Sequence, residues 1–434
     1  MTENASLARR AVSRRWFLAG LSATALVATG CASESSGSSS SSSSSGSASA
    51  SGSLSATGAA AAGSVAALAQ AFYATLDDDQ KATTLLEYSL SNAARWSNLP
   101  QGLITGGGTG GTGGGGTPPS GASGGTPPSG SAGGTPPSGA PGGGGSDSSG
   151  GAATGTSSGT GGSSQARVGI NLGELSDKQL KAFYKLLKAA TGTATGLGYA
   201  EVTAHLAADD YLEAHGGGDT YGRDNFYVAL LGSPQDSGTW EFQFGGHHLA
   251  VANTYIDGKL VGATPSFRGI EPNGDFTQDG VKYNALRVKE AAFTALLAGL
   301  SSDQLATAKL SDVYTDLVLG PGKDWAFPTD HEGIQVSSLS ARQKKLVLAT
   351  IATYVNDIAD ADAATILKRY KSGLDDTYLA YSGTTALTEK NDYIRIDGPS
   401  VWIEFSMQAG IVLSGNHPHS VWRDRTTDYG GTQS

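Results

Sequence analysis

The chain has 434 residues, of which 38% are hydrophobic and 63 are glycine, and its formal net charge is −10 at neutral pH. A negative surface repels phosphate backbones, so this charge argues against a nucleic-acid-binding protein. The single cysteine, Cys31, excludes an intramolecular disulfide and any metal site built from several thiolates.

The first thirty residues have the pattern of a secretory signal. Four arginines precede an apolar run over residues 16–29, which is too short to span a bilayer. Residues 13–18 resemble the twin-arginine export consensus, and residues 28–31 resemble a lipobox in which Ala28 replaces the usual leucine. We therefore expect the twin-arginine machinery to export the chain, and a lipid on Cys31 to anchor it to the outer face of the cell membrane.

Two segments have compositions that cannot support a packed core. Residues 31–59 consist almost entirely of small residues, mainly Ser, Gly, Ala and Thr, which is typical of a flexible tether. Residues 103–165 repeat Gly-Gly-Thr-Pro-Pro-Ser-Gly three times and are predicted to form a disordered insert. Because a stretch of about forty residues buries too little surface to fold alone, we expect 60–102 and 166–434 to form one globular domain.

Helical patterns begin near the start of this expected domain. The spacing of Val65, Leu68 and Phe72 predicts one helix, and the apolar residues of 85–90 have a similar spacing. Further amphipathic helices are predicted over residues 180–187, 197–212, 285–300, 339–358 and 361–370.

Strand patterns lie between the predicted helices. Residues 240–244 alternate apolar and polar side chains, and residues 249–256 turn at Asp257-Gly258 into a strand over 260–267. A second hairpin is predicted from residues 393–396 and 401–405. Strands and helices do not alternate regularly, so we predict an α+β fold in which helices pack on an antiparallel sheet.

Four of the seven histidines occur in two pairs. His417 and His419 flank Pro418, which disfavours a helix at His417, so both imidazoles are expected on the same side of an extended segment. His247 and His248 follow two glycines and would face opposite sides of a regular strand, although the glycines allow a bulge that redirects one of them. At most one of this second pair is therefore expected to join a site with the first pair.

Neutral imidazoles together with a carboxylate suit zinc, iron, copper or manganese. Glu404 and Asp424 are candidates to complete such a set, and Arg268 and Arg423 are candidates to bind a carboxylate or phosphate. The alternative is structural: the histidines cap turns and lie apart in the fold, and the arginines form ordinary ion pairs.

Several stretches together resemble the bacterial family known as domain of unknown function 3500. They are Gly246-His247-His248-Leu249, the segment from Thr264-Pro265 to Pro272, the hairpin at 393–405, and His417-Pro418-His419-Ser420-Val421-Trp422-Arg423-Asp424. The resemblance covers residues 62–102 and 166–434, and this chain departs from the family pattern by its long insert and by Pro418. It implies that one site contains His247, His248, Glu404, His417, His419 and Arg423, but it implies no activity.

Two functions fit these residues. In the first, the chain is a metal-dependent enzyme of hydrolase or lyase type, in which the histidines hold the metal. Glu404 is then a fourth ligand or general base, and Arg423 orients a small anionic compound. In the second, the chain is a tethered module that binds a metal or a small ligand without catalysis.

Overall fold

The computed structural model describes residues 54–105 and 166–433, which belong to one compact unit. The predicted signal, Cys31, most of the tether and almost all of the insert lie outside the described residues. In the described part of the chain, no helix has the length and apolar character that crossing a membrane requires.

Helices and strands are mixed along the chain, which confirms the predicted α+β class. The longer helices are α1 (Val65–Tyr73), α5 (Asp177–Ala190), α6 (Tyr199–Leu212), α7 (Arg287–Ala298), α9 (Ala341–Val355) and α10 (Asp360–Ser372). The shorter ones are α2 (Asp78–Thr84), α3 (Leu90–Ala93), α4 (Gln101–Thr105) and α8 (Ser302–Ala308). The predicted helices from 180 to 370 are confirmed. The helical interpretation of residues 85–90 is wrong at its start, because Leu85 and Leu86 pair as strand β1.

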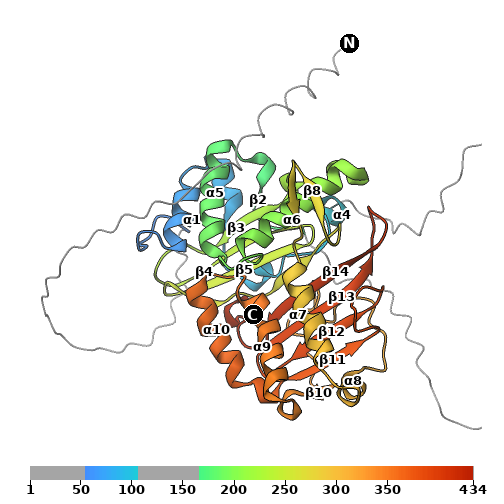
Figure 1. Cartoon of the computed structure of the whole chain (residues 1–434). Coiled ribbons are helices and arrows are strands. Elements are labelled where there is room, and N and C mark those ends of the chain that lie inside the picture. The colour runs from blue at the N-terminus through green and yellow to red at the C-terminus, as the bar shows by residue number, and fades with distance from the viewer. Residues whose placement is uncertain (1–53, 106–165, 434) are drawn as a thin grey trace, which may run out of the picture. The chain divides into compact units, whose positions relative to one another are not determined.

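A single sheet of twelve strands forms the centre of the unit (Figure 1). Across the sheet the order is β1 (Leu85–Leu86), β3 (Tyr227–Leu231), β4 (Thr239–Gly246), β5 (Leu249–Ile256), β7 (Ser266–Gly269), β14 (Asn416–Asp424), β13 (Val401–Ala409), β12 (Tyr393–Asp397), β11 (Tyr378–Ser382) and β10 (Ile334–Gln335). In addition, β2 (Ile170–Asn171) pairs with β3, and β6 (Lys259–Gly262) pairs with β5. The pairing of β1 with β3 is parallel and the other pairings in this sheet are antiparallel, as predicted. A separate hairpin joins β8 (Phe276–Gln278) to β9 (Val281–Tyr283).

The predicted strand over residues 260–267 is in fact two strands. β6 ends at Gly262, and β7 begins at Ser266, directly after Pro265. Proline has no backbone N–H to donate to a neighbouring strand, so the ladder is interrupted there. β5 consequently pairs with β6 near its end and with β7 near its start.

The sheet consists of two halves with the same order of elements. In the N-terminal half (residues 54–105 and 166–269), β2, α5, α6, β3, β4, β5 and β7 follow one another. In the C-terminal half (residues 287–433), β10, α9, α10, β11, β12, β13 and β14 do the same. β7 and β14 pair antiparallel at the centre, so an approximate two-fold axis relates the halves.

The register places this axis. Leu249 of β5 pairs with Arg268, and the corresponding Val401 of β13 pairs with Asp424. Arg268 and Asp424 are therefore equivalent positions, and two residues earlier Ser266 pairs with its own equivalent, Trp422. The axis passes near that pair.

The two halves also share sequence and backbone conformation. Residues 169–176 read Gly-Ile-Asn-Leu-Gly-Glu-Leu-Ser, and residues 333–340 read Gly-Ile-Gln-Val-Ser-Ser-Leu-Ser. Gly169 and Gly333 have φ angles of +96° and +95°, and a Cβ on either would lie 2.2 Å from a carbonyl oxygen of the facing strand. Only glycine fits such a position, so the same steric requirement recurs in both halves.

The helices that follow these segments begin alike. The backbone N–H of Ser176 donates to Gln179 at 2.8 Å before α5, and that of Ser340 donates to Gln343 at 2.9 Å before α9. These are the reciprocal contacts of a capping box. The shared order, register and caps indicate that the domain consists of two copies of one folding unit.

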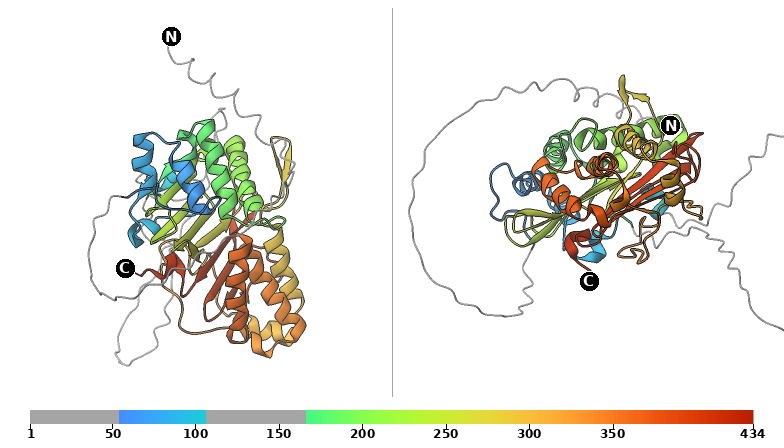
Figure 2. Two further views of the ribbon diagram at one scale, coloured as in Figure 1. Left: turned by 90° about the vertical axis from the view of Figure 1, so that its left-hand side faces the viewer. Right: turned by 60° about the horizontal axis from the view of Figure 1, so that its bottom comes forward.

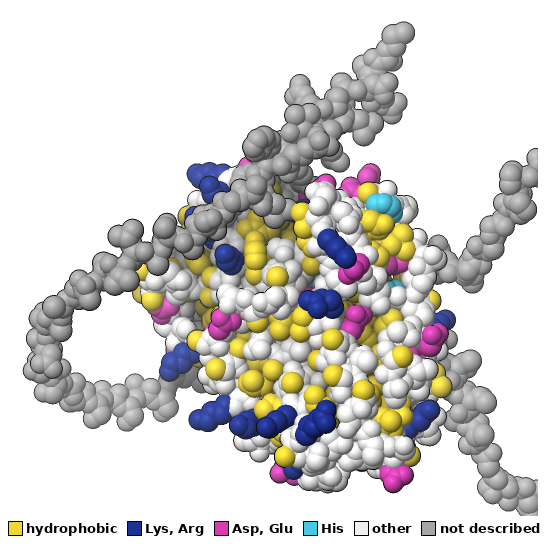
Figure 3. All heavy atoms as spheres, viewed as in Figure 1, with side chains coloured by type: hydrophobic (Ala, Val, Ile, Leu, Met, Phe, Trp, Pro, Cys, Tyr) yellow, Lys and Arg dark blue, Asp and Glu magenta, His cyan; other side chains and the backbone are white. Residues whose placement is uncertain are grey.

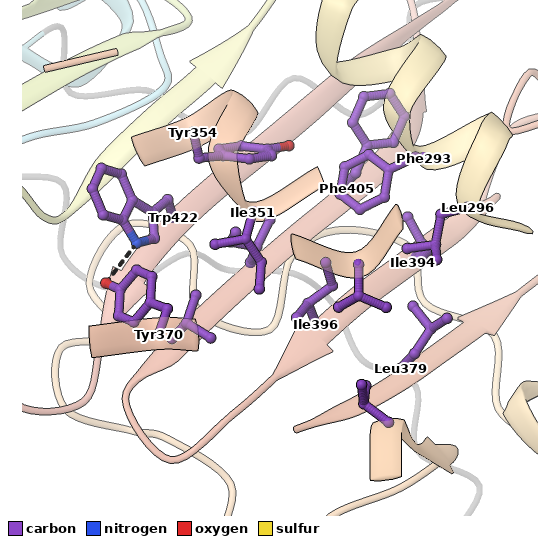
Figure 4. Close-up of a cluster of buried hydrophobic side chains, with 14 of the residues drawn as sticks. Phe293, Leu296, Ile351, Tyr354, Tyr370, Leu379, Ile394, Ile396, Phe405 and Trp422 are labelled. Carbon is purple, nitrogen blue, oxygen red and sulfur yellow. Dashed lines mark hydrogen bonds between the residues drawn. The ribbon is translucent and has the colours of Figure 1, made fainter. Parts of the chain in front are cut away.

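The longer helices cover one face of the sheet in both halves (Figure 2), and the short helix α3 and irregular segments cover the other face. In the C-terminal half, Phe293 of α7 packs against Tyr354 of α9 and Phe405 of β13, and Trp422 donates a hydrogen bond to the Tyr370 hydroxyl at 3.0 Å (Figure 4). The N-terminal half has a separate core in which the helices likewise pack on the sheet. Full burial of each large apolar side chain contributes roughly 1.5–3 kcal/mol, so these two cores are the main stabilising feature.

The helix-bearing face carries charged side chains of both signs (Figure 3). Lys and Arg side chains gather over the lower ends of α9 and α10, while Asp and Glu side chains are scattered singly. In α10, Asp360 and Asp362 lie in the first turn and Arg369 and Lys371 in the last, which complements the helix dipole. His417 and His419 of β14 lie on the opposite face.

Candidate functional site

The candidate site lies at one end of β14, on the face that the helices leave uncovered. Ser420 and Trp422 point toward the helices, where their side chains bond to Tyr354 and Tyr370. Side chains alternate along a strand, so His417 and His419 point to the other face. The ring nitrogens Nε2 of His417 and His419 lie 3.3 Å apart, which confirms that the two imidazoles share one side.

The turn between β4 and β5 brings a third histidine to the same place. His247 and His248 form this two-residue turn, and His248 has a φ angle of +59°. The backbone N–H of His248 donates to the carbonyl of Asn98 at 3.1 Å, and its carbonyl accepts from the N–H of Gly269 at 2.8 Å. These two bonds fix the turn so that the imidazole of His248 faces β14.

His248, His417 and His419 form one buried group. Nε2 of His419 lies 3.2 Å from Nε2 of His248, and one ligand atom from each ring lies within 4.8 Å of the others. The exposed fractions of the three residues are 6%, 2% and 8%. Nitrogen ligands placed tetrahedrally at the usual zinc distance are roughly 3.3 Å apart, so this group can hold a metal ion.

Hydrogen bonds between the rings account for only one of the two short contacts. Nδ1 of His419 lies 3.1 Å from Oδ1 of Asp316, and an ionised carboxylate only accepts, so this nitrogen carries the proton. Nε2 of His419 then has a single lone pair and can accept from one neighbouring ring. A cation held between the three nitrogens would account for both contacts.

Asp316 has the position of an outer partner of a metal ligand. A carboxylate that accepts the second N–H of a ligating histidine fixes the tautomer and orientation of that ring. Burial raises the pKa of the Asp316 carboxyl, but the interaction with His419, chiefly its hydrogen bond, outweighs burial and leaves the pKa below its usual value. The Asp316 side chain is 53% exposed, so the site opens to solvent on this side.

The environment keeps two of the imidazoles neutral. Burial and the neighbouring histidines lower the pKa of His248 well below its usual value. Burial and His419 lower the pKa of His417 to about 3. Neutral imidazole is the form that binds a metal, so both rings are in the binding form at neutral pH.

His247 lies outside the group, so its placement does not support the prediction of His247 as a ligand, and only one member of its pair joins the first pair. Its Nδ1 bonds to Oδ1 of Asp209 at 2.6 Å, and its ring stacks on that of His248 with centroids 3.7 Å apart. Asp209 belongs to α6 and also accepts the N–H of Gly222 at 2.8 Å. His247 therefore packs against a ligand instead of providing one.

The position of Glu404 corrects its prediction as a fourth ligand or general base. It lies on the same face as the histidines, but its two oxygens accept four hydrogen bonds of 2.6–2.8 Å. The donors are the backbone N–H groups of Val318 and Leu319, the Tyr393 hydroxyl and the Trp402 indole. Glu404 is fully buried by these contacts and does not belong to the histidine group.

The two arginines proposed for substrate binding are buried in ion pairs. Arg268 bonds to Glu201 and Asp357, and these acids also bind Lys289. This quartet lies on the helix side of the sheet, so Arg268 does not face the histidines. Its predicted contact with substrate has no support in this placement.

Arg423 and Asp424 are also engaged away from the histidines. Arg423 pairs with Asp428 at 2.6 Å and with Asp324 at 3.1 Å. Asp424 accepts from Arg369 and from the Tyr370 hydroxyl, so the prediction that Asp424 completes a metal site is wrong. The structure thus brings together three of the four predicted histidines and leaves the carboxylates and arginines in other contacts.

Sequence reasoning missed Asp316 and Asp209. Asp316 lies 103 residues before His419, and Asp209 lies 38 residues before its partner His247. No spacing rule connects residues that meet only through the sheet, and single acids are common in loops and helices. The repeat at 169–176 and 333–340 indicates a duplicated scaffold, but it includes neither of these acids.

The comparisons with known proteins agree with the resemblance drawn from the motifs. The family described as "Protein of unknown function (DUF3500)" matches residues 162–431, which is more than half of the chain and includes all three histidines of the group. Residues 62–102 lie outside the match. No curated protein and no solved structure matches this chain. The chain belongs to the DUF3500 family of proteins of unknown function.

Proposed function

We propose that the chain binds one divalent transition-metal ion through His248, His417 and His419 and acts as a metal-dependent enzyme of hydrolase or lyase type. The observation that carries this proposal is that Nε2 of His419 lies within 3.3 Å of both other Nε2 atoms. Catalytic zinc sites use three protein ligands and leave a fourth position for water, whereas structural sites are closed by four. The described residues supply three.

The surrounding residues favour water activation at such a centre. A bound divalent ion with neutral ligands lowers the pKa of its water to about 7. Asp316 holds the His419 ring through Nδ1, and its exposed side marks the approach for a substrate. An anionic substrate would be bound by the positive centre itself, because Arg268 and Arg423 are used in ion pairs.

The second candidate is a metal-binding module without catalysis. It is favoured by one observation: the groups predicted as base and substrate clamp, Glu404 and Arg423, are occupied by other residues. This candidate requires no turnover. It predicts the same metal content as the first.

Hydrolysis of an activated ester separates the two candidates. The zinc-loaded full chain is expected to hydrolyse the ester with a rate that rises near pH 7, and a His417→Ala, His419→Ala variant is expected to lose that rate. Ser400→Ala, in the turn that corresponds to His247–His248 in the C-terminal half, is the matched control and is expected to retain it. If the wild type binds zinc but hydrolyses the ester no faster than the double variant, the result supports the binding module without catalysis.

We also propose that the chain is an exported lipoprotein, on the basis of the twin-arginine pattern at residues 13–18 and the position of Cys31. Expressed in a host with this pathway, the full chain is expected in the detergent-soluble membrane fraction. Cys31→Ser is expected to move it to the soluble exported fraction. An unchanged distribution would contradict the lipid anchor.

A further inference from the structure

Residues 309–333 form a strap across the sheet face that the helices leave uncovered. The strap connects α8 to β10 and has little regular structure of its own. It carries Asp316, the partner of His419, and it is the segment whose placement decides whether that contact forms.

Charged and aromatic side chains of the sheet fasten the strap along its length. Arg423 donates to the carbonyl of Leu319 at 3.2 Å, and Arg425 donates to that of Pro328 at 3.1 Å. The ring of Tyr314 stacks on Tyr393 with centroids 4.3 Å apart. The strap is thus held by contacts at several points, and the stack of Tyr314 lies two residues before Asp316.

Glu404 makes the attachment on the other side of Asp316. Its Oε2 accepts the N–H of Val318 at 2.6 Å, and its Oε1 accepts the N–H of Leu319 at 2.8 Å. These amides are two and three residues beyond Asp316. The intervening N–H of Leu317 donates to Oδ1 of Asp316 at 2.7 Å, the same oxygen that faces His419.

We propose that Glu404 is a positioning residue for the metal centre: it clamps the strap at Val318 and Leu319 and so holds Asp316 against His419. This inference rests on the proposed metal site. Hydrogen bonds from backbone amides to a buried carboxylate are strong because the acceptor is charged and water is excluded. Asp316 itself is half exposed, so its own contacts provide little restraint without that clamp.

The N-terminal half provides an internal comparison for this clamp. Ala252 of β5 occupies the position that corresponds to Glu404 of β13, since it pairs with Gln243 as Glu404 pairs with Arg395. An alanine at this position accepts no amides. The carboxylate clamp is therefore a feature of the half that carries the strap with Asp316.

Zinc affinity and hydrogen exchange of the full chain test the role of Glu404. Asp316→Asn is expected to lower zinc affinity by about 10–100-fold, as loss of an outer partner does. Glu404→Gln is expected to lower it severalfold, because the amide turns N–H groups toward Val318 or Leu319. In the metal-free chain, Glu404→Gln is expected to speed exchange of peptides containing these two amides.

The double variant identifies the route of the effect. If Glu404 acts through Asp316, Glu404→Gln with Asp316→Asn binds zinc as weakly as Asp316→Asn alone. Glu241→Gln is the matched control, since Glu241 is an equally buried carboxylate of β4 that bonds to Thr254 and Gln243. It is expected to leave zinc affinity and strap exchange unchanged.

Two results would overturn the inference. One is a Glu404→Gln variant with wild-type zinc affinity and wild-type exchange at Val318 and Leu319. The other is a double variant whose loss equals the product of the two single losses. A wild-type chain that binds no zinc contradicts the proposed metal centre. Hydrogen exchange tests the clamp separately, because that experiment is done on the metal-free chain. If Glu404→Gln does not fold, Tyr393→Phe removes one donor to Glu404, and it must still speed exchange of the strap.

Discussion

The turn between β4 and β5 and the turn between β12 and β13 occupy equivalent places in the two halves of the sheet. The first consists of His247 and His248, and the second of Pro399 and Ser400. The two turns join equivalent pairs of strands, β4 with β5 and β12 with β13, and the register is the same in both pairs. The first carries His248, a member of the group that could hold a metal ion, and the second carries no member of that group.

The neighbouring strands differ in the same way. β14 runs without interruption through His417 and His419 to Asp424, whereas its counterpart is divided into β6 and β7. At the end of β6, a Cβ on Gly262 would lie 2.1 Å from the carbonyl oxygen of Thr427. The C-terminal segment therefore packs directly against the backbone of β6. The duplicated scaffold therefore supplies two equivalent ends, and a few residues distinguish the end that carries the histidine group.

The largest expected effect concerns the contact between the halves. Arg268 of the N-terminal half and Lys289 of the C-terminal half share Glu201 and Asp357, with all four side chains at most 2% exposed. Arg268→Met leaves two acids with one cation and is expected to lower the free energy of unfolding by about 3–5 kcal/mol. Chemical denaturation measures this loss. Asp424→Asn, at the equivalent position, is expected to cost less, because its partner Arg369 is 36% exposed.

Ligand removal should distinguish the two ends of the sheet. His419→Ala removes the ring that contacts both other ligands and is expected to lower zinc affinity more than about 100-fold, beyond the loss of an outer partner. Ser400→Ala alters the equivalent turn and should bind zinc as the wild type does. Equal affinities of the two variants in a chelator competition would show that the histidine end is not the site.

Acid should destabilise the metal-free chain through the histidine end. The pKa of His417 is about 3 in the folded chain, below its ordinary value, so the unfolded chain binds the proton first. The stability that comes from keeping His417 neutral is fully present above its ordinary pKa and is lost as the pH falls toward 3. The loss from pH 7 to pH 5 is about 2 kcal/mol for this residue.

Urea denaturation at both pH values measures that loss, and His417→Gln provides the control. The variant is expected to lose less stability than the wild type over the same interval. A wild type and a variant with the same pH dependence would show that His417 is not buried in its neutral form.

The smallest expected effect is equal in the two halves. Ser176→Ala and Ser340→Ala each remove the hydroxyl that bonds to the side chain of Gln179 or Gln343 at the start of a helix. The backbone N–H of each position can still donate to the same glutamine. Each substitution is expected to lower the free energy of unfolding by about 1 kcal/mol. Thermal denaturation of the two variants checks the equivalence, and costs that differ by more than twofold would contradict it.

Periodicity predicted most of the helices and both central hairpins, because each pattern depends on local residues and one buried face. The α+β class and the extended His417–Pro418–His419 segment followed from the same local rules. The division of one strand was missed although Pro265 marks it locally. The pairing of β7 with β14 was not predictable, because long-range pairing has no local pattern.

The candidate site was predictable in part for the same reason. His417 and His419 share a face through alternation, so local sequence was sufficient for them. Glu404 lies on that face too, but its role depends on backbone amides of the strap, which no side-chain motif reveals. The repeated Gly-Ile segments at 169 and 333 carried further information, since recognising them as a duplication predicts the symmetric order of strands.

Metal content tests the central claim most directly. The full chain, purified after export, is expected to contain one equivalent of a divalent transition metal by elemental analysis, and His419→Ala is expected to contain almost none while Ser400→Ala retains it. A folded wild-type chain without stoichiometric metal, which also takes up none on incubation with zinc, iron, copper or manganese, would contradict the proposed centre at His248, His417 and His419.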